Sequence, residues 1–187
     1  MFATVPEDLV ISHGSHQSRA DGMCVMELVA YLAGEPHTVT PACACPIVTK
    51  AAQVLNDGAP NDETRTRVLR PYLGRLATSR ADRQTEERRV WALVDLSVRT
   101  IAADAMEMAH LPIPAATLRG LARVHTIERA KAAEAAAWDE AWAARRAWAA
   151  ARAAAWAART AEAAAWDAAG AAWERYTVLM LETLLAV

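Results

Sequence analysis

The sequence predicts an all-α protein, and three of its features lead to this fold class. Apolar residues recur at intervals of three and four over most of the chain, which is the spacing of one helix face. Prolines and glycines gather between these segments, where helices should begin and end. From position 126 onward the chain has no proline, and alanine dominates as far as Trp173. We expect a compact helical domain over residues 1–124, followed by a long Ala/Trp-rich helix or helical hairpin over residues 125–187.

The N-terminal segment, residues 1–20, is polar and contains Gly14 and two histidines, His13 and His16. Residues 8–12 form its only stretch that resembles a short strand, and we interpret the whole segment as an ordered loop. Paired histidines suggest a metal or phosphate site, but on a polar loop they more often face solvent. We therefore expect both rings to be exposed.

The first helix should open at Asp21, because aspartate is a good N-cap residue, and it should end at Gly34. Its apolar residues would form one buried face: Cys24, Val25, Leu28, Val29 and Leu32. Residues 37–46, which follow, are rich in threonine, proline and cysteine and should form a tight loop.

Two shorter helices are expected next. Pro46 suits the first position of a helix, and the Asn-Asp-Gly sequence at 56–58 should terminate it. Another helix should begin near Asp62, and Pro71 should kink or divide it.

The helix predicted from Asp82 to Met108 has the apolar spacing of a central core helix. The Arg/Glu-rich run from Arg80 to Arg89 should be a solvated helix face. Two prolines within 111–114 break the chain, and Pro114 should start a short helix that ends near residue 124.

The alanine-rich segment should be asymmetric around its helix axis. With residues about 100° apart, its tryptophans fall within an arc of roughly 140° and the opposite side is almost pure alanine. The tryptophans of this arc are Trp138, Trp142, Trp148, Trp156, Trp166 and Trp173. Arginines repeat within the same arc at Arg145, Arg152 and Arg159. An alanine surface allows close packing against another helix, which favours a homo-oligomer.

Two interpretations of this stripe stay open. Indole and guanidinium groups can line a groove for a small anionic, nucleotide-like ligand or for a host protein. The residues of that groove would be Trp138, Trp142, Arg145, Trp148, Arg152, Trp156 and Arg159. Alternatively, large side chains opposite small ones simply fill the space between helices, which is the commoner use of such a stripe. Extended nucleic acid is an unlikely ligand, because acidic and basic residues nearly balance along the segment.

The last stretch, Tyr176–Val187, returns to an ordinary amphipathic pattern. It should dock on the globular domain or on a second subunit. Gly170 is the place where a hairpin would turn, if the segment is not a single rod.

Three cysteines and one histidine supply the four ligands of a tetrahedral zinc site. These residues are Cys24, His37, Cys43 and Cys45. A Cys-x-Cys spacing is weaker evidence for zinc than two Cys-x-x-Cys pairs. Small buried thiols that only pack are therefore the commoner explanation.

A cysteine nucleophile is the third possibility for this cluster. Cys24 lies near the start of a helix, where backbone amides favour a thiolate. His13, His16 or His37 could then act as the base, and Glu27 or Glu35 could orient it. Linear spacing does not select among them, and Cys24, His37 and Glu27 are the set we name. The alternative to a binding function is thus a zinc-binding or cysteine-dependent enzyme centred on Cys24, His37 and Cys43.

Charge and cysteine content limit the function further. The formal net charge of -2 argues against a strongly basic nucleic-acid-binding protein. No apolar run is long enough to cross a bilayer, and the N-terminus lacks the pattern of a signal peptide. An odd number of cysteines suits reduced thiols. We therefore expect a cytoplasmic protein without a membrane partner.

Three short segments, 22–27, 33–37 and 41–46, together with the Ala/Trp tail, resemble a family of actinobacterial and actinophage proteins. The resemblance covers roughly residues 13–99 and, loosely, the tail. It implies a bacterial or phage cytoplasmic setting, and it carries over no catalytic residues. Small phage proteins without enzyme motifs are often interaction proteins. We therefore expect a non-enzymatic binding protein, with a purely structural helical oligomer as a further alternative.

Overall fold

The computed structural model describes residues 9–133, 135–136 and 162–186, and for residues 162–169 it describes the backbone only. Every regular element within the described residues is a helix. The predicted all-α fold class is confirmed. The chain divides into two compact units, of which unit 1 contains Met1–Arg89 with Ala169–Val187 and unit 2 contains Val90–Ala168. Unit 1 thus combines residues from both halves of the chain.

The first helix, α1 (Val25–Leu32), begins later than Asp21 because Cys24 is its N-cap residue. Gly22 has a positive φ of 126°, so a right-handed helix cannot run through Gly22 from Asp21 to Cys24. The backbone N–H of Cys24 donates to Oε2 of Glu27 at 2.8 Å, which closes a capping box at the start of α1.

The next two helices begin at the expected positions, Pro46 and Asp62. Pro46 opens α2 (Pro46–Gly58), and the side chain of Asn61 accepts from the N–H of Thr64 at the start of α3 (Asp62–Leu69). Pro71 divides the following segment into a 3-10 turn, η1 (Arg70–Tyr72), and a short helix, α4 (Leu73–Ala77).

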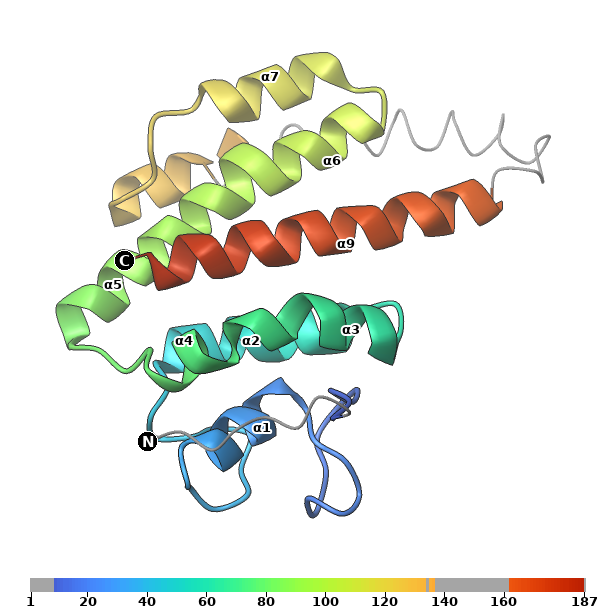
Figure 1. Ribbon diagram of the computed structural model, residues 1–187. Coiled ribbons are helices and arrows are strands. Elements are labelled where there is room, and N and C mark those ends of the chain that lie inside the picture. The colour runs from blue at the N-terminus through green and yellow to red at the C-terminus, as the bar shows by residue number, and fades with distance from the viewer. Residues whose placement is uncertain (1–8, 134, 137–161, 187) are drawn as a thin grey trace. The chain divides into compact units, whose positions relative to one another are not determined.

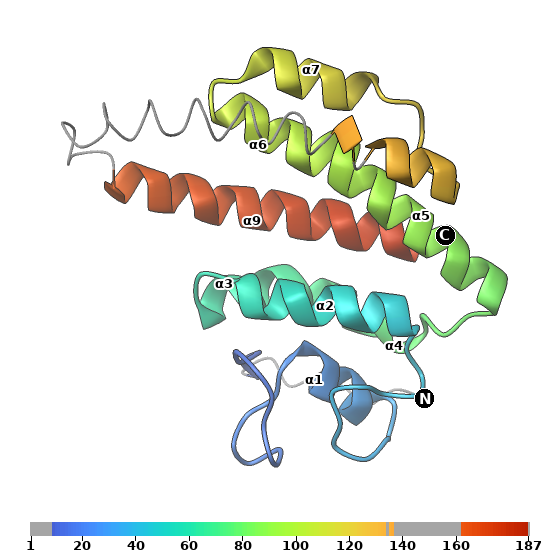
Figure 2. The same ribbon diagram turned by 180° about the vertical axis from the view of Figure 1, so that it is seen from behind.

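In unit 1, the layer formed by α2, α3 and α4 lies between α1 and the C-terminal part of α9 (Glu162–Leu185), as Figures 1 and 2 show. Almost all of α1 is buried, and Leu181 and Leu184 of α9 are fully buried. The indole Nε1 of Trp173 donates to the carbonyl oxygen of Leu55, 3.1 Å away. The C-terminal stretch therefore docks on the globular part of its own chain, which was one of its two predicted sites.

One buried arginine joins α2 to α3. Arg65 is 2% exposed, and its Nε donates to the carbonyl oxygen of Asn56 at 2.7 Å, at the C-terminal end of α2. Its guanidinium also pairs with Asp62. Arg89 is a second buried arginine, 6% exposed, and it donates to the carbonyl oxygen of Ser79 at 2.6 Å. The prediction of a solvated face therefore fails at Arg89.

Unit 2 contains the end of α5 (Arg83–Leu96), a π-helical turn η2 (Ser97–Ala102), α6 (Ala103–Met108) and α7 (Pro112–Gly120). The turn η2 joins α5 to α6 without a break, so the predicted helix ending at Met108 is present. Helix α7 begins at Pro112 instead of Pro114, because either proline suits a first helical turn. Within the described part of the chain, no helix is long and apolar enough to span a bilayer.

Candidate functional site

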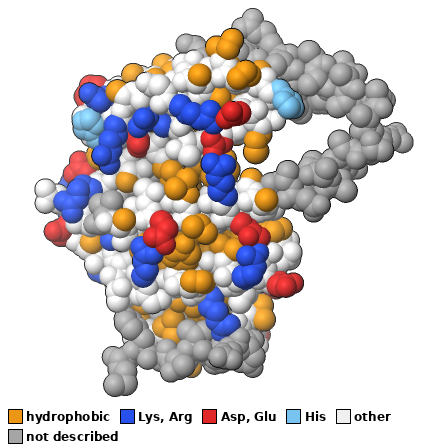
Figure 3. Space-filling model, turned by 45° about the horizontal axis from the view of Figure 1, so that its top comes forward, with side chains coloured by type: hydrophobic (Ala, Val, Ile, Leu, Met, Phe, Trp, Pro, Cys, Tyr) orange, Lys and Arg blue, Asp and Glu red, His pale blue; other side chains and the backbone are white. Residues whose placement is uncertain are grey.

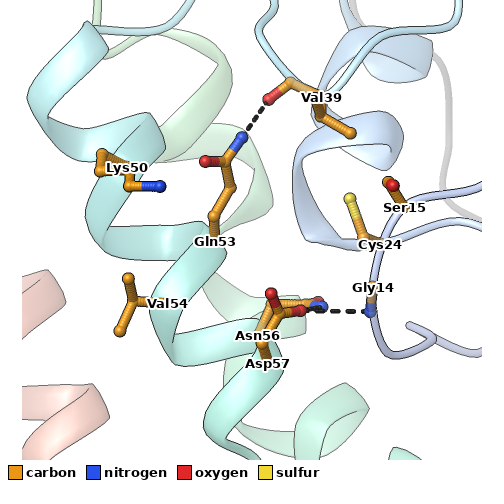
Figure 4. A pocket seen from close by; sticks show the side chains of 9 residues that line it. All are labelled: Gly14, Ser15, Cys24, Val39, Lys50, Gln53, Val54, Asn56 and Asp57. Atoms are coloured by element: carbon orange, nitrogen blue, oxygen red, sulfur yellow. Dashed lines mark hydrogen bonds between the residues drawn. The ribbon is translucent and has the colours of Figure 1, made fainter.

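A cleft of about 340 Å³ lies in unit 1 between the N-terminal loop and α2, and we call it the Lys50 cleft. Figure 4 shows Lys50 and Gln53 of α2 on one side and Cys24 and Ser15 on the other. Its floor includes Asn56 and Asp57, at the C-terminal end of α2. The cleft therefore combines a helix face with a loop that is distant in sequence.

Asn56 holds the loop against α2 and α1. It is 1% exposed, and its Oδ1 accepts from the N–H of Val25 at 3.1 Å while its Nδ2 donates to the carbonyl oxygen of Ser12 at 3.1 Å. Oδ1 of Asp57 accepts from Nδ2 of Asn56 at 3.0 Å and from the N–H of Gly14 at 3.1 Å. Asn56 and Asp57, expected from the sequence only to end a helix, thus also shape the floor of the cleft.

Gln53 and Lys50, two further polar residues of α2, differ in whether their side chains have partners within the chain. Nε2 of Gln53 donates to the carbonyl oxygen of Val39 at 2.8 Å. This hydrogen bond holds the loop of residues 37–46 at the edge of the cleft. The side chain of Lys50 is exposed, and among the described residues it has no ion-pair partner.

The carboxylate of Glu27 is 1% exposed and accepts three hydrogen bonds. It accepts from the backbone N–H of His16 at 2.7 Å, from Nδ1 of His16 at 2.8 Å and from the N–H of Cys24 at 2.8 Å. Burial alone would raise the pKa of Glu27, but these donors outweigh burial and leave its pKa below the usual value. Glu27 therefore stays ionised at neutral pH and holds the N-terminal loop in place.

The second histidine of this cluster is His37. Its Nε2 donates to the carbonyl oxygen of His16 at 3.0 Å and lies 3.5 Å from Oε1 of Glu27. Its Nδ1 is buried and has no hydrogen-bond partner among the described atoms. His13 is exposed as predicted, but His16 is not, because the side chain of His16 is 13% exposed and contacts Glu27.

Two of the cysteine thiols are protonated at neutral pH. Burial raises the pKa of Cys24 to about 11, and the lowering by the N–H groups of Glu27 and Met26 is smaller. Burial and the adjacent Glu35 carboxylate raise the pKa of Cys43 to about 11. The predicted helix N-terminus is present at Cys24, but burial outweighs its effect on the thiol.

The four residues considered for zinc belong to different local structures. Cys24 caps α1, Cys45 caps α2, His37 is bonded to His16, and the N–H of Cys43 donates to Glu35 at 2.8 Å. In the part of the chain that the structure describes, no three His, Cys, Asp or Glu residues are arranged to hold a metal ion. The structure thus brings His37 to Glu27, and it does not gather these four residues into a metal centre.

The Trp/Arg groove predicted from Trp138 to Arg159 lies outside the described residues and stays a prediction. One tryptophan of the same arc, Trp173, has a described side chain. Its indole contacts α2 through the hydrogen bond to Leu55, so this tryptophan packs between helices.

Sequence reasoning missed the polar groups of the Lys50 cleft. Lys50, Gln53 and Asp57 recur at helical spacing along one side of α2, and that recurrence was the available signal. The loop that faces them cannot be read from helical spacing. Comparisons of the chain with protein-family models, with curated proteins and with solved structures find no match. The geometry of the site is therefore the basis for inferring function.

Proposed function

We propose that this protein is a non-enzymatic binding protein that holds a small anionic ligand in the Lys50 cleft. The observation that carries the proposal is the ammonium group of Lys50 at the edge of a formed cleft, without an ion-pair partner among the described residues. A lysine ammonium is a compact positive charge that suits a phosphate or a carboxylate.

The carboxylates of Asp57 and Glu27 already accept hydrogen bonds from other groups. Oδ1 of Asp57 already accepts hydrogen bonds from Gly14 and Asn56. The carboxylate of Glu27 is buried and accepts hydrogen bonds from His16 and Cys24. Neither carboxylate forms an ion pair with Lys50 among the described residues, and the ammonium group of Lys50 is the positive charge that would attract an anion.

Size and chemistry indicate the class of ligand. A volume of about 340 Å³ is at the lower end of the range for small-molecule sites. Gln53, Ser15 and Cys24 can contribute polar contacts beside Lys50. A nucleotide or another small organic phosphate fits this combination, and nucleotides are the first class to test.

The thiol of Cys24 supports binding in preference to cysteine catalysis. A pKa of about 11 keeps it protonated at neutral pH, and a nucleophilic cysteine needs a thiolate. Three free cysteines also suit the reducing cytoplasm, which we propose as the location of the protein.

The experiment measures binding of AMP, GMP, ATP and inorganic phosphate to the full chain by isothermal titration calorimetry. The substitution Lys50→Gln should weaken binding about tenfold, because it removes one charge-assisted contact. A tenfold loss of affinity corresponds to about 1.4 kcal/mol of binding free energy. Lys131→Gln is the matched control, because Lys131 is the only other lysine of the sequence and is exposed in unit 2.

The proposal fails if none of these probes binds at millimolar concentration. It also fails if Lys50→Gln and Lys131→Gln bind a probe with the same affinity as the unmodified protein. Circular dichroism spectra of both variants serve to show that the helices are intact.

A further inference from the structure

A second hollow, of about 280 Å³, adjoins the Lys50 cleft in unit 1, and we call it the Arg80 hollow. It is lined by α2 and by the loop of residues 37–46, together with Arg80 from the link between α4 and α5. Lys50 and Gln53 line both the hollow and the cleft. The two spaces therefore share one stretch of α2 as a wall.

The order of the lining residues along α2 shows how the two spaces follow each other. Pro46 and Thr49, near the start of α2, line only the Arg80 hollow. Asn56 and Asp57, near its end, line only the Lys50 cleft. At about 1.5 Å per residue, the lining stretch of α2 is roughly 16 Å long. An extended ligand can therefore lie in both spaces and pass Lys50 between them.

Hydrogen bonds hold the backbone of Arg80 against the loop that it faces. The N–H of Arg80 donates to the carbonyl oxygen of Cys43 at 3.1 Å. The N–H of Cys45 donates to Oγ of the buried Ser79 at 3.0 Å. The carboxylate of Glu35 holds the same loop by accepting from the N–H of Cys43 at 2.8 Å. The fold thus fixes the point from which the exposed side chain of Arg80 extends.

Lys50 and Arg80 place two positive charges on the Arg80 hollow, whose described lining residues include no aspartate or glutamate. Neither cation has an ion-pair partner among the described residues. Other basic residues of unit 1 are paired, as Arg75 is with Glu182 at 2.7 Å. Figure 3 shows acidic and basic side chains lying next to each other on one face of the molecule. The two cations of the hollow are therefore suited to a ligand that carries more than one negative charge.

We propose that the ligand is a nucleoside di- or triphosphate, with its innermost phosphate at Lys50 and an outer phosphate at Arg80. This proposal rests on the proposed function of the Lys50 cleft and narrows its ligand class. The nucleoside lies in the cleft, and the phosphate chain passes Lys50 into the Arg80 hollow. A guanidinium can donate two parallel hydrogen bonds to a phosphate, whereas an ammonium binds it as a compact charge. A nucleoside monophosphate has no outer phosphate for Arg80.

Isothermal titration calorimetry of the full chain with AMP, ADP and ATP, in buffer without divalent cations, tests the proposal. We expect ADP and ATP to bind about tenfold more tightly than AMP, because they make one more hydrogen-bonded charge contact. Arg80→Gln should remove this advantage and leave the affinity for AMP unchanged. Lys50→Gln should weaken the binding of all three nucleotides.

Arg83→Gln is the matched control, because Arg83 is exposed at the start of α5 and lines neither space. This variant should bind ATP like the unmodified chain. Equal affinities for AMP, ADP and ATP overturn the proposal, as do equal losses of ATP affinity in Arg80→Gln and Arg83→Gln. Either result leaves the proposed function standing if Lys50→Gln still weakens binding. If none of the three nucleotides binds, both proposals are overturned.

Discussion

Glu27 is the residue on which the N-terminal part of unit 1 depends most directly. Its carboxylate accepts hydrogen bonds from His16 and Cys24 and lies close to His37, so one side chain joins two loops to the start of α1. A buried carboxylate with fewer donors would be destabilising. Here the donors make the ionised form the more stable one, which has a direct consequence for acid stability.

Because the pKa of Glu27 is lower in the folded protein than in the unfolded chain, its stabilising effect is complete above the unfolded value of about 4.5. The effect is lost as the pH falls through the folded pKa. We expect Glu27→Gln to lower the free energy of unfolding by about 2 kcal/mol at pH 7. Urea denaturation at several pH values should show that this difference shrinks below pH 4.5. The exposed control Glu87→Gln should change little, and a Glu27→Gln difference that stays constant down to pH 3 would contradict the assignment.

Gly22 is required at its position for two independent reasons. Its φ of 126° is rarely adopted by other residues, and a Cβ atom there would lie 2.9 Å from the ring of His16. We expect Gly22→Ala to destabilise the protein by at least about 2 kcal/mol, because it adds a clash to backbone strain. Gly34→Ala is the matched control, since Gly34 also has a positive φ, 72°, but has no atom within 4 Å of the added Cβ. Equal losses for the two variants in urea denaturation would show that the contact with His16 has no effect.

At the scale of elements, α9 combines fully buried residues in its last turns with a hydrogen bond to α2. Leu181 and Leu184 are fully buried, and Trp173 donates a hydrogen bond to α2. The charged residues Glu174 and Glu182 lie on the exposed edge of the same helix. Helix α9 therefore has an inner face that stabilises the fold and an outer edge that carries ion pairs with Arg67 and Arg75.

The inner face of α9 can be tested through Leu181. We expect Leu181→Ala to lower the free energy of unfolding by about 2–5 kcal/mol, the usual range for a buried leucine. Leu185→Ala is the control, because Leu185 is only partly buried. Hydrogen exchange should show faster exchange in α2 and α3 for Leu181→Ala. Unchanged protection of these helices would mean that α9 does not support them.

At the scale of the whole molecule, both ends of the chain contribute to one compact unit. The hydrogen bond from Trp173 to Leu55 and the ion pair between Arg67 and Glu174 each join residues more than 100 positions apart. The Lys50 cleft belongs to this unit. The Lys50 cleft therefore depends on contacts between segments that are distant in sequence.

The sequence by itself determined the features that depend on neighbouring residues. Helical spacing of apolar residues indicated the all-α fold, Pro46 and Pro71 marked helix boundaries, and the apolar C-terminal stretch indicated a docking helix. These signals are local because a helix repeats within four residues. The later start of α1 was missed, because it depends on the conformation of Gly22 and on the contact with His16.

Only the tertiary structure decided which polar groups meet. It joined Glu27 to His16 and His37, placed Asn56 and Asp57 against the N-terminal loop, and buried the thiol of Cys24 enough to raise its pKa. The physical reason is that burial and hydrogen bonding depend on how distant segments pack, and helical periodicity carries no information about partners in other segments.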